Sequence, residues 1–246
     1  MALQTDFDPS DSVVSLGCND SEKRFHVHEH LLHDKLPNIE VPISEQPMIY
    51  LELDFPYATV SNLARWLYTG SIPNLDSGNA NMGVAGSIED IQAGQDLQCV
   101  AFQDAALDVL IDELINPDGY DLAETFSRLL QVFEDGSAGR QYAVDFFVYY
   151  AGYTSLERST YEGLRQLKDP DFIGAVAREI CKYQNINAGP ESFESEQSSM
   201  TVVMGYLEMK TCDDNFWQGM QWWDPRDGDG CRYHRHTELG LPCYRA

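Results

Sequence analysis

Basic residues are scarce in this sequence: 16 Lys and Arg stand against 40 Asp and Glu, which gives a formal net charge of −24. Binding to nucleic acid or to anionic lipid requires Lys and Arg that displace counterions from phosphates or sit in the negative potential of a membrane surface. We therefore expect no nucleic-acid partner and no membrane partner. The scarcity is greatest between Arg65 and Arg128, where 11 acidic residues occur without a single Lys or Arg.

Long apolar runs are also absent. No stretch of the sequence approaches the ~18 to 20 consecutive apolar residues that a bilayer-spanning helix needs. Residues 1–12 are acidic and polar, without the basic and apolar regions of a secretory signal. We therefore expect a cytoplasmic or nuclear protein. The six cysteines are too few and too scattered for a disulfide scaffold, and in a reducing compartment they would remain thiols or metal ligands.

The sequence lacks the common nucleotide-binding and catalytic motifs. It has no G-x-x-x-x-G-K-S/T, no G-x-G-x-x-G after a predicted strand, no G-x-S-x-G and no H-E-x-x-H. Hydrophobic residues nevertheless make up 43% of the chain, which is enough to form a core. We expect a folded protein that is not an enzyme.

The N-terminal part of the sequence alternates between strand patterns and helix patterns. Short β-branched or alternating segments between turn residues are typical of strands, and apolar residues three to four positions apart are typical of helices. The predicted elements are a hairpin over residues 12–28, a short helix that starts at His28 and breaks before Pro37, a strand over 48–53 and a helix over 54–70. Asp54 is expected to cap the last helix and Gly70 to end it, because a carboxylate accepts hydrogen bonds from free N–H groups and glycine adopts the left-handed conformation.

From Ile88 onward the apolar residues recur at helical spacing almost throughout. Ser137 is expected to cap one of these helices, and Asp169-Pro170 is expected to open another, because proline is favoured in the first helical turn. Polar residues predict a surface loop at 73–86 and a linker at 189–199. The sequence therefore predicts the α+β class, with a small sheet and packed helices at about residues 10–116, an all-helical extension at 117–188, and a linker and tail at 189–246.

An acidic stripe is the first candidate binding site. Asp104, Asp108 and Asp112 recur at a spacing of four, so in a helix they line one face and repel each other by roughly 0.2 to 0.5 kcal/mol per pair. Such a stripe faces either water or a basic protein partner. Both interpretations remain open at this point.

A group of cysteines and histidines near the C-terminus is the second candidate site. Its members are Cys231, His234, His236 and Cys243. Two thiolates and two imidazoles are the ligand set of a closed structural zinc site, although the spacing differs from the usual zinc finger. The sequence predicts either a zinc site in a metal-binding protein or metal-dependent enzyme, or partly buried side chains in a terminal hook where Arg232 and Arg235 pair with nearby acids.

Several segments together carry a family resemblance. They are Val13-Val-Ser-Leu16, Phe25-His-Val-His28, Ile49-Tyr-Leu-Glu-Leu53, Ala64-Arg-Trp-Leu-Tyr-Thr-Gly70 and the segment Asp96–Asp108. In order and spacing they resemble the BTB/POZ domain, the last being similar to its closing helical pair. Two further segments, Glu134–Phe147 and Cys231–His236, resemble BTB/POZ proteins of filamentous fungi. The resemblance covers roughly residues 10–185.

The resemblance implies a protein–protein interaction module without a catalytic step. Members of the family serve as substrate adaptors for cullin-RING ubiquitin ligases or as transcriptional co-regulators, so the implied protein partner is a cullin or a transcription factor. A homodimer is a further expectation. The resemblance also implies a structural role for His28, which lies where the predicted hairpin ends and the first predicted helix begins.

Overall fold

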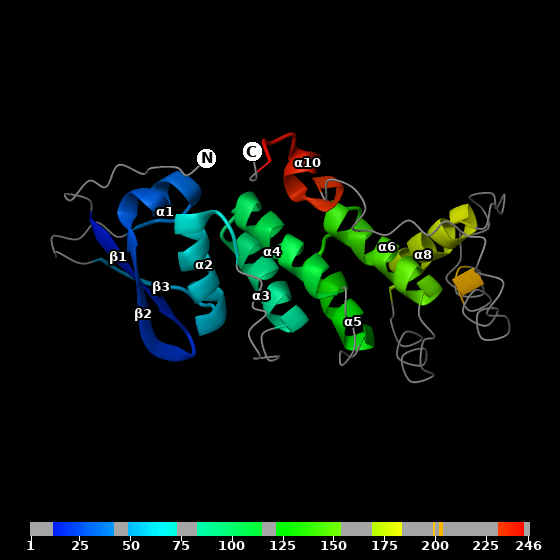
Figure 1. Ribbon diagram of the computed structural model, residues 1–246, viewed down its shortest axis with the longest axis horizontal. Coiled ribbons are helices and arrows are strands. Elements are labelled where there is room, and N and C mark those ends of the chain that lie inside the picture. Colours follow the sequence, from blue (N-terminus) through cyan, green and yellow to red (C-terminus); the bar gives the residue numbers. More distant parts are fainter. Residues whose placement is uncertain are drawn as a thin grey trace. The chain divides into compact units, whose positions relative to one another are not determined.

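The structure, a computed structural model, describes residues 12–41, 49–72, 83–114, 122–153, 169–183, 199, 202–203 and 231–243 (Figure 1). The chain divides into two compact units, one formed by residues 1–115 and 242–246 and the other by residues 116–241. The fold is mixed α+β, with one small sheet and several helices, as the sequence predicts. Within the described residues, no helix has both the length and the apolar character that crossing a bilayer requires. The predicted linker at 189–199 lies outside the described residues except for Ser199.

The first unit contains a three-stranded sheet with the order β2-β1-β3. Its strands are β1 (Val13–Cys18), β2 (Ser21–His28) and β3 (Ile49–Glu52). β1 pairs antiparallel with β2 and parallel with β3, so the predicted hairpin and the predicted third strand are both confirmed. Val14 lies opposite Val27 and Ile49, and this row belongs to the face on which the helices pack.

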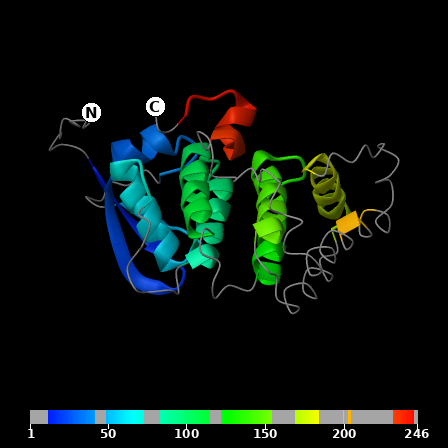
Figure 2. The same ribbon diagram turned by 45° about the vertical axis from the view of Figure 1, so that its right-hand side comes forward.

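Helices cover one face of this sheet and form most of the core of the first unit. They are α1 (Glu29–Lys35), α2 (Tyr57–Thr69), α3 (Gly83–Asp96) and α4 (Val100–Glu113). α2 contacts β1 and β2 on one side and α3 on the other, and α3 packs along α4 (Figure 2). Trp66 of α2 meets Phe102 of α4 edge to face, with ring centroids 5.4 Å apart. The expected loop at 73–86 ends earlier than the polar composition indicates, because α3 already begins at Gly83.

The start of α2 departs from the prediction that Asp54 caps it. The backbone N–H of Tyr57 donates instead to Asp20 Oδ1 at 2.6 Å, while Asp54 accepts a hydrogen bond from the Asn19 side chain at 3.1 Å. Asp20 lies in the turn between β1 and β2, so the hairpin supplies the cap from a distant part of the sequence. The predicted end of the helix is confirmed, since Gly70 has a φ of 70° in the left-handed region.

The described elements of the second unit are all helical. They are α5 (Leu122–Val132), α6 (Ala138–Tyr153), α8 (Pro170–Tyr183), the 3-10 turn η2 (Cys231–Tyr233) and α10 (Arg235–Leu239). The predicted cap at Ser137 is confirmed, since its Oγ accepts from the N–H of Arg140 at 3.2 Å. The predicted helix start at Asp169-Pro170 is also confirmed, and there Asp169 Oδ1 accepts from the N–H of Phe172 at 2.8 Å. α6 packs against α5 and α8. The core between these helices is aromatic and contains Phe126, Phe146, Phe147 and Phe172.

Candidate functional site

The acidic stripe lies on α4, where its three members differ in exposure. Asp104 is 1% exposed, Asp108 is half-buried and Asp112 is exposed. The expectation of one exposed acidic face is therefore wrong at Asp104. The physical reason is that Phe102–Leu107 are all buried, so α4 has no solvated side over these residues. A role in partner binding stays a prediction for Asp108 and Asp112.

Some acidic side chains of the first unit are wholly or partly buried in its interior. Asp90 of α3 is 3% exposed, and its Oδ2 accepts a hydrogen bond from Asn62 Nδ2 at 2.7 Å. Burial raises the pKa of Asp90 to about 7, against the hydrogen bond from Asn62, which lowers it. Glu113 accepts from Ser87 Oγ at 2.8 Å, and burial raises its pKa as well. Sequence reasoning missed the buried Asp90 and the half-buried Glu113, because nothing in the sequence distinguishes Asp90 from Glu89 before it.

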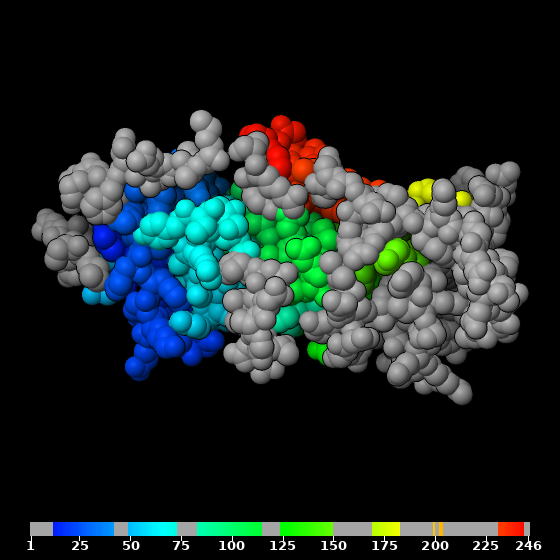
Figure 3. Space-filling model, in the orientation of Figure 1, coloured from blue at the N-terminus to red at the C-terminus, as the bar shows by residue number. Residues whose placement is uncertain are grey.

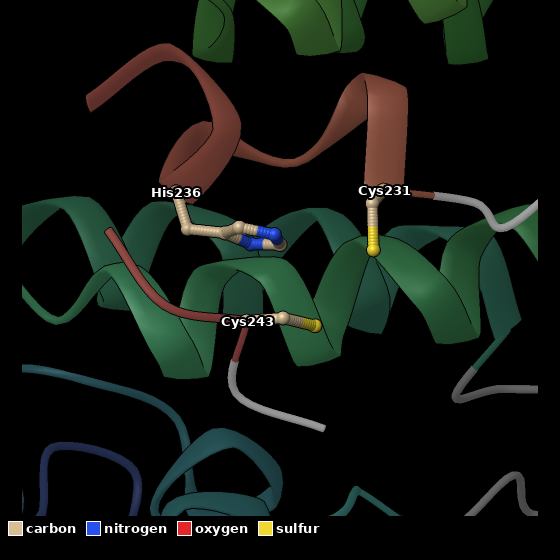
Figure 4. Close-up of side chains that lie close together, drawn as sticks. All are labelled: Cys231, His236 and Cys243. Atoms are coloured by element: carbon tan, nitrogen blue, oxygen red, sulfur yellow. The ribbon is translucent and has the colours of Figure 1, made fainter. Parts of the chain in front are cut away.

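The candidate metal site is a possible Cys/His metal-binding cluster in the C-terminal stretch 231–243. The structure brings together Cys231 at the start of η2, His236 in α10 and Cys243 beyond α10 (Figure 4). The two Sγ atoms and one ring nitrogen of His236 lie within 4.8 Å of one another. Three of the four predicted ligands are thus neighbours.

Hydrogen bonds and a chain reversal within residues 231–243 bring the three side chains together. Thr237 Oγ1 donates to the carbonyl of Cys231 at 2.6 Å, which ties α10 to η2. After α10 the chain reverses at Gly240, whose φ of 64° is left-handed, and the N–H of Leu241 donates to the carbonyl of His236 at 2.9 Å. Cys243 follows Leu241 by two residues, a span of at most about 7 Å, so it remains close to His236.

Charged and polar contacts anchor the stretch on α6. Asp145 of α6 is 3% exposed and accepts hydrogen bonds from Tyr233 Oη at 2.8 Å and from Gln141 Nε2 at 2.8 Å. The guanidinium of Arg232 pairs with the same carboxylate, and Arg235 pairs with Glu134 at 3.4 Å. The prediction that Arg232 and Arg235 pair with nearby acids is confirmed. Cys231 therefore precedes two residues that a buried carboxylate holds in place.

The Asp145 network is strongly desolvated. Burial raises the pKa of Asp145 even though Tyr233, Gln141 and Arg232 stabilise its charged form. Burial, together with the neighbouring Asp145 charge, also raises the pKa of the Tyr233 phenol. Tyr233 thus remains a neutral hydrogen-bond donor to Asp145. No feature of the sequence predicted this network, because the two residues are separated by 88 positions.

His234 is not part of the group that Cys231, His236 and Cys243 form. It is the N-cap of α10, with an extended backbone (φ −82°, ψ 139°), and its side chain is completely buried. Its ring centroid lies 5.2 Å from that of His236, at an angle of 57° between the ring planes. In a second possible metal-binding group, ring nitrogens of His234 and His236 lie within 4.8 Å of each other.

The three grouped side chains fit a transition metal. Zinc binds thiolate sulfur at about 2.3 Å and imidazole nitrogen at about 2.0 Å, so tetrahedral ligand atoms lie roughly 3.6 to 3.8 Å apart. The upper limit of 4.8 Å observed here exceeds that by about an ångström, which side-chain rotation of half-buried Cys231 and Cys243 can close. Soft sulfur donors combined with imidazole favour zinc over magnesium or calcium.

Comparisons with known proteins identified no relative: no family model, no curated protein and no solved structure matches the chain.

Proposed function

We propose that the chain is a non-catalytic protein–protein interaction module of the BTB/POZ type. It would act as a substrate adaptor for a cullin-RING ubiquitin ligase or as a transcriptional co-regulator. One observation carries the proposal: the five segments that resemble the BTB/POZ domain itself fall on the sheet and helices of the first unit. Val13–Leu16 lies on β1, Phe25–His28 on β2, Ile49–Leu53 on and just after β3, and Ala64–Gly70 on the end of α2.

Exposed aromatic side chains in the first unit support this proposal. Tyr50 on β3 is 56% exposed and Tyr68 on α2 is 50% exposed. Figure 3 shows side chains of the β2 and α2 regions, coloured blue and cyan, at the surface of the first unit. Tyrosine is enriched among the residues that dominate binding energy at protein interfaces, because it offers a large rigid apolar area and a polar tip. These two tyrosines are the anchors that we assign to partner binding.

Affinity capture from cell extract with the full chain tests the proposal, with captured proteins identified by mass spectrometry. Recovery of a cullin supports the adaptor role, and recovery of transcription factors or their co-regulators supports the second role. Tyr50→Ala is the matched variant and should lower recovery, because it removes an exposed anchor without touching the core. If the extract yields neither class of protein, the proposal fails.

Self-association is part of the proposal, because the resemblance implies a homodimer. Light scattering of the purified chain during size-exclusion chromatography measures its mass directly. A mass of twice 27.8 kDa supports homodimerisation. A mass of one chain at all concentrations removes it from the proposal and leaves the binding of other proteins to be tested separately.

A second candidate function is the binding of zinc by Cys231, His236 and Cys243. The observation that favours it is the placement of two thiols and an imidazole within 4.8 Å of one another. Metal analysis of the purified chain should find about one zinc per chain, and a chelator should lower its melting temperature. Cys243→Ser should lose the metal, whereas His33→Gln, which changes an exposed imidazole in α1, should keep it. The absence of zinc together with melting that ignores the chelator would remove this candidate.

A further inference from the structure

We propose that Cys231 and Cys243 are a redox-active pair that hydrogen peroxide converts to a disulfide. The inference uses two members of the candidate metal site, but it does not rest on metal binding, because a disulfide requires only the two thiols. It goes beyond the zinc candidate by assigning a covalent modification to these residues. Oxidation and metal binding would compete, since a sulfur in a disulfide no longer offers a thiolate to a metal.

The short distance between the two sulfur atoms is the first step. Both residues are thiols in the structure, and their Sγ atoms lie within 4.8 Å of each other. Figure 4 shows the side chain of Cys243 directed toward that of Cys231. A disulfide requires the sulfur atoms to be about 2.05 Å apart. A change of χ1 from one rotamer to the next moves an Sγ atom by about 3 Å, so side-chain rotation can close the gap.

The local backbone, which keeps the two cysteines near each other, is the second step. Thr237 Oγ1 donates to the carbonyl of Cys231 at 2.6 Å, and the N–H of Leu241 donates to the carbonyl of His236 at 2.9 Å. These two hydrogen bonds fold the chain back on itself before it reaches Cys243. Pairing of the sulfurs therefore requires rotation of side chains and not a new path of the backbone, which is the usual obstacle to a disulfide.

Exposure of the thiols is the third step. Among the cysteines that the structure describes, Cys231 and Cys243 are half-buried, whereas Cys18, Cys99 and Cys181 are buried. Burial also raises the pKa of the Cys99 and Cys181 thiols, which lowers the fraction present as thiolate. Oxidation by peroxide follows thiolate character and exposure. We therefore expect peroxide to react with the half-buried pair before it reacts with the three buried thiols.

The oxidation takes two steps. In the first, the thiolate of one cysteine attacks an oxygen of hydrogen peroxide and the O–O bond breaks. The sulfur becomes a sulfenic acid, and the departing hydroxide takes up the proton that the thiol released, forming water. In the second, the other thiol attacks the sulfenic sulfur, so that the S–S bond forms, the S–O bond breaks and a second water leaves. Overall, the two thiols lose two electrons and two protons, and peroxide is reduced to water.

Peroxide treatment of the purified full chain tests the inference, after a chelator has removed any metal. Remaining thiols are blocked by alkylation, and the chain is digested with trypsin without a reducing agent. Trypsin cleaves after Arg232 and Arg235, so Cys231 and Cys243 fall on separate peptides. Mass spectrometry should find these two peptides joined as the main oxidised product, and a reducing agent should separate them. If other cysteines are oxidised while these two peptides stay separate, the inference is overturned.

Two variants and an unfolded control show whether the folded structure causes the pairing. Cys243→Ser should abolish the joined peptides, whereas Cys181→Ala, which changes a buried thiol, should keep them. In a glutathione redox buffer, the joined fraction should be larger for the folded chain than for the chain in urea at the same ratio of oxidised to reduced glutathione. Equal fractions would show that closeness in sequence alone produces the link, and would overturn the inference.

Added zinc separates this inference from the metal binding proposed above. If both proposals hold, zinc should slow the joining of the two peptides, and the oxidised chain should bind no zinc until it is reduced. If the peptides join at the same rate with zinc present, the metal candidate fails and the redox pair stands. If zinc binds but the metal-free thiols never join, the redox pair alone fails.

Discussion

Tyr68 of α2 holds His28 at the point where β2 passes into α1. The backbone N–H of His28 donates to the Tyr68 hydroxyl at 3.2 Å, and His28 Nδ1 lies 2.8 Å from the same oxygen. The Tyr68 hydroxyl offers one hydrogen and two lone pairs, so it accepts the N–H of His28 and forms a second hydrogen bond with Nδ1 whose direction depends on the tautomer of His28. This contact joins two of the segments that carry the family resemblance, and it gives His28 the structural role that the resemblance implies.

Replacing Tyr68 with Phe should weaken the first unit. The change removes both hydrogen bonds to His28 while keeping the ring, so we expect the free energy of unfolding to fall by about 1 kcal/mol. Urea denaturation followed by circular dichroism measures this loss. Tyr50→Phe is the matched control because it removes a similarly exposed hydroxyl outside this contact. Equal effects of the two variants would show that the contact with His28 contributes nothing.

Asp90→Asn should stabilise the protein in a pH-dependent way. In the folded protein the pKa of Asp90 is raised to about 7 by burial, well above its unfolded value, so the folded state holds this proton over a wider pH range. The contribution of Asp90 to the free energy of unfolding is therefore greatest at low pH, decreases between about pH 4 and pH 7, and stays constant at higher pH. The total decrease is up to about 4 kcal/mol. The unfolding free energy of the Asp90→Asn variant does not fall in this way, because asparagine does not titrate.

The measurement for Asp90 is the difference in unfolding free energy between the variant and the unchanged chain at several pH values. The stabilisation by Asp90→Asn should be small near pH 4 and should grow to its full size at pH 8. Asp34→Asn, at an exposed position in α1, serves as the control and should show little growth. A difference for Asp90→Asn that does not change with pH would contradict the buried, proton-holding state of this carboxyl.

Substitution by alanine should change the stability of the protein very differently at Gly94 and at Gly17. A Cβ on Gly94 would lie 2.8 Å from the backbone N and Cα of Gln103, so α3 and α4 would have to separate. A Cβ on Gly17 would meet only the ends of the Arg24 and Glu52 side chains, which form an exposed ion pair and can move aside. We expect Gly94→Ala to cost about 1 to 3 kcal/mol and Gly17→Ala less than about 1 kcal/mol. Denaturant midpoints that reverse this order would contradict the close approach of the two helices.

Loss of the Tyr233 hydroxyl should weaken metal binding without removing a ligand. Tyr233→Phe deprives buried Asp145 of a hydrogen bond and loosens the segment that begins with Cys231. Changes to groups that support metal ligands lower affinity by about 10- to 100-fold, and we expect a loss near the lower end. Competition with a chromogenic zinc chelator measures it. Tyr68→Phe, in the other unit, should leave zinc affinity unchanged.

Local patterns of the first unit were sufficient to predict most of its elements. β-branched and alternating residues predicted the hairpin, and Gly70 predicted the end of α2, because each signal depends on a few neighbouring residues. The cap of α2 was not predictable in this way. Asp20 and Asp54 are both carboxylates near turns, and only the folding of the hairpin decides that Asp20 reaches Tyr57.

The candidate site was predictable in its residue types and not in its geometry. The Cys and His composition of the tail indicated a metal site, but spacing alone could not show that Cys231, His236 and Cys243 form one group while His234 joins His236 in another. The acidic stripe illustrates the same limit. Its spacing places the three aspartates on one side of a helix, whereas the burial of Asp104 depends on how α4 packs.

The central claim is that the chain acts by binding another protein, and direct binding between purified components tests it most sharply. Calorimetric titration of the purified full chain with the purified protein recovered by capture avoids indirect association through third proteins. We predict saturable binding at a defined stoichiometry, weakened by Tyr50→Ala. No binding to any captured protein once it is purified would contradict the claim.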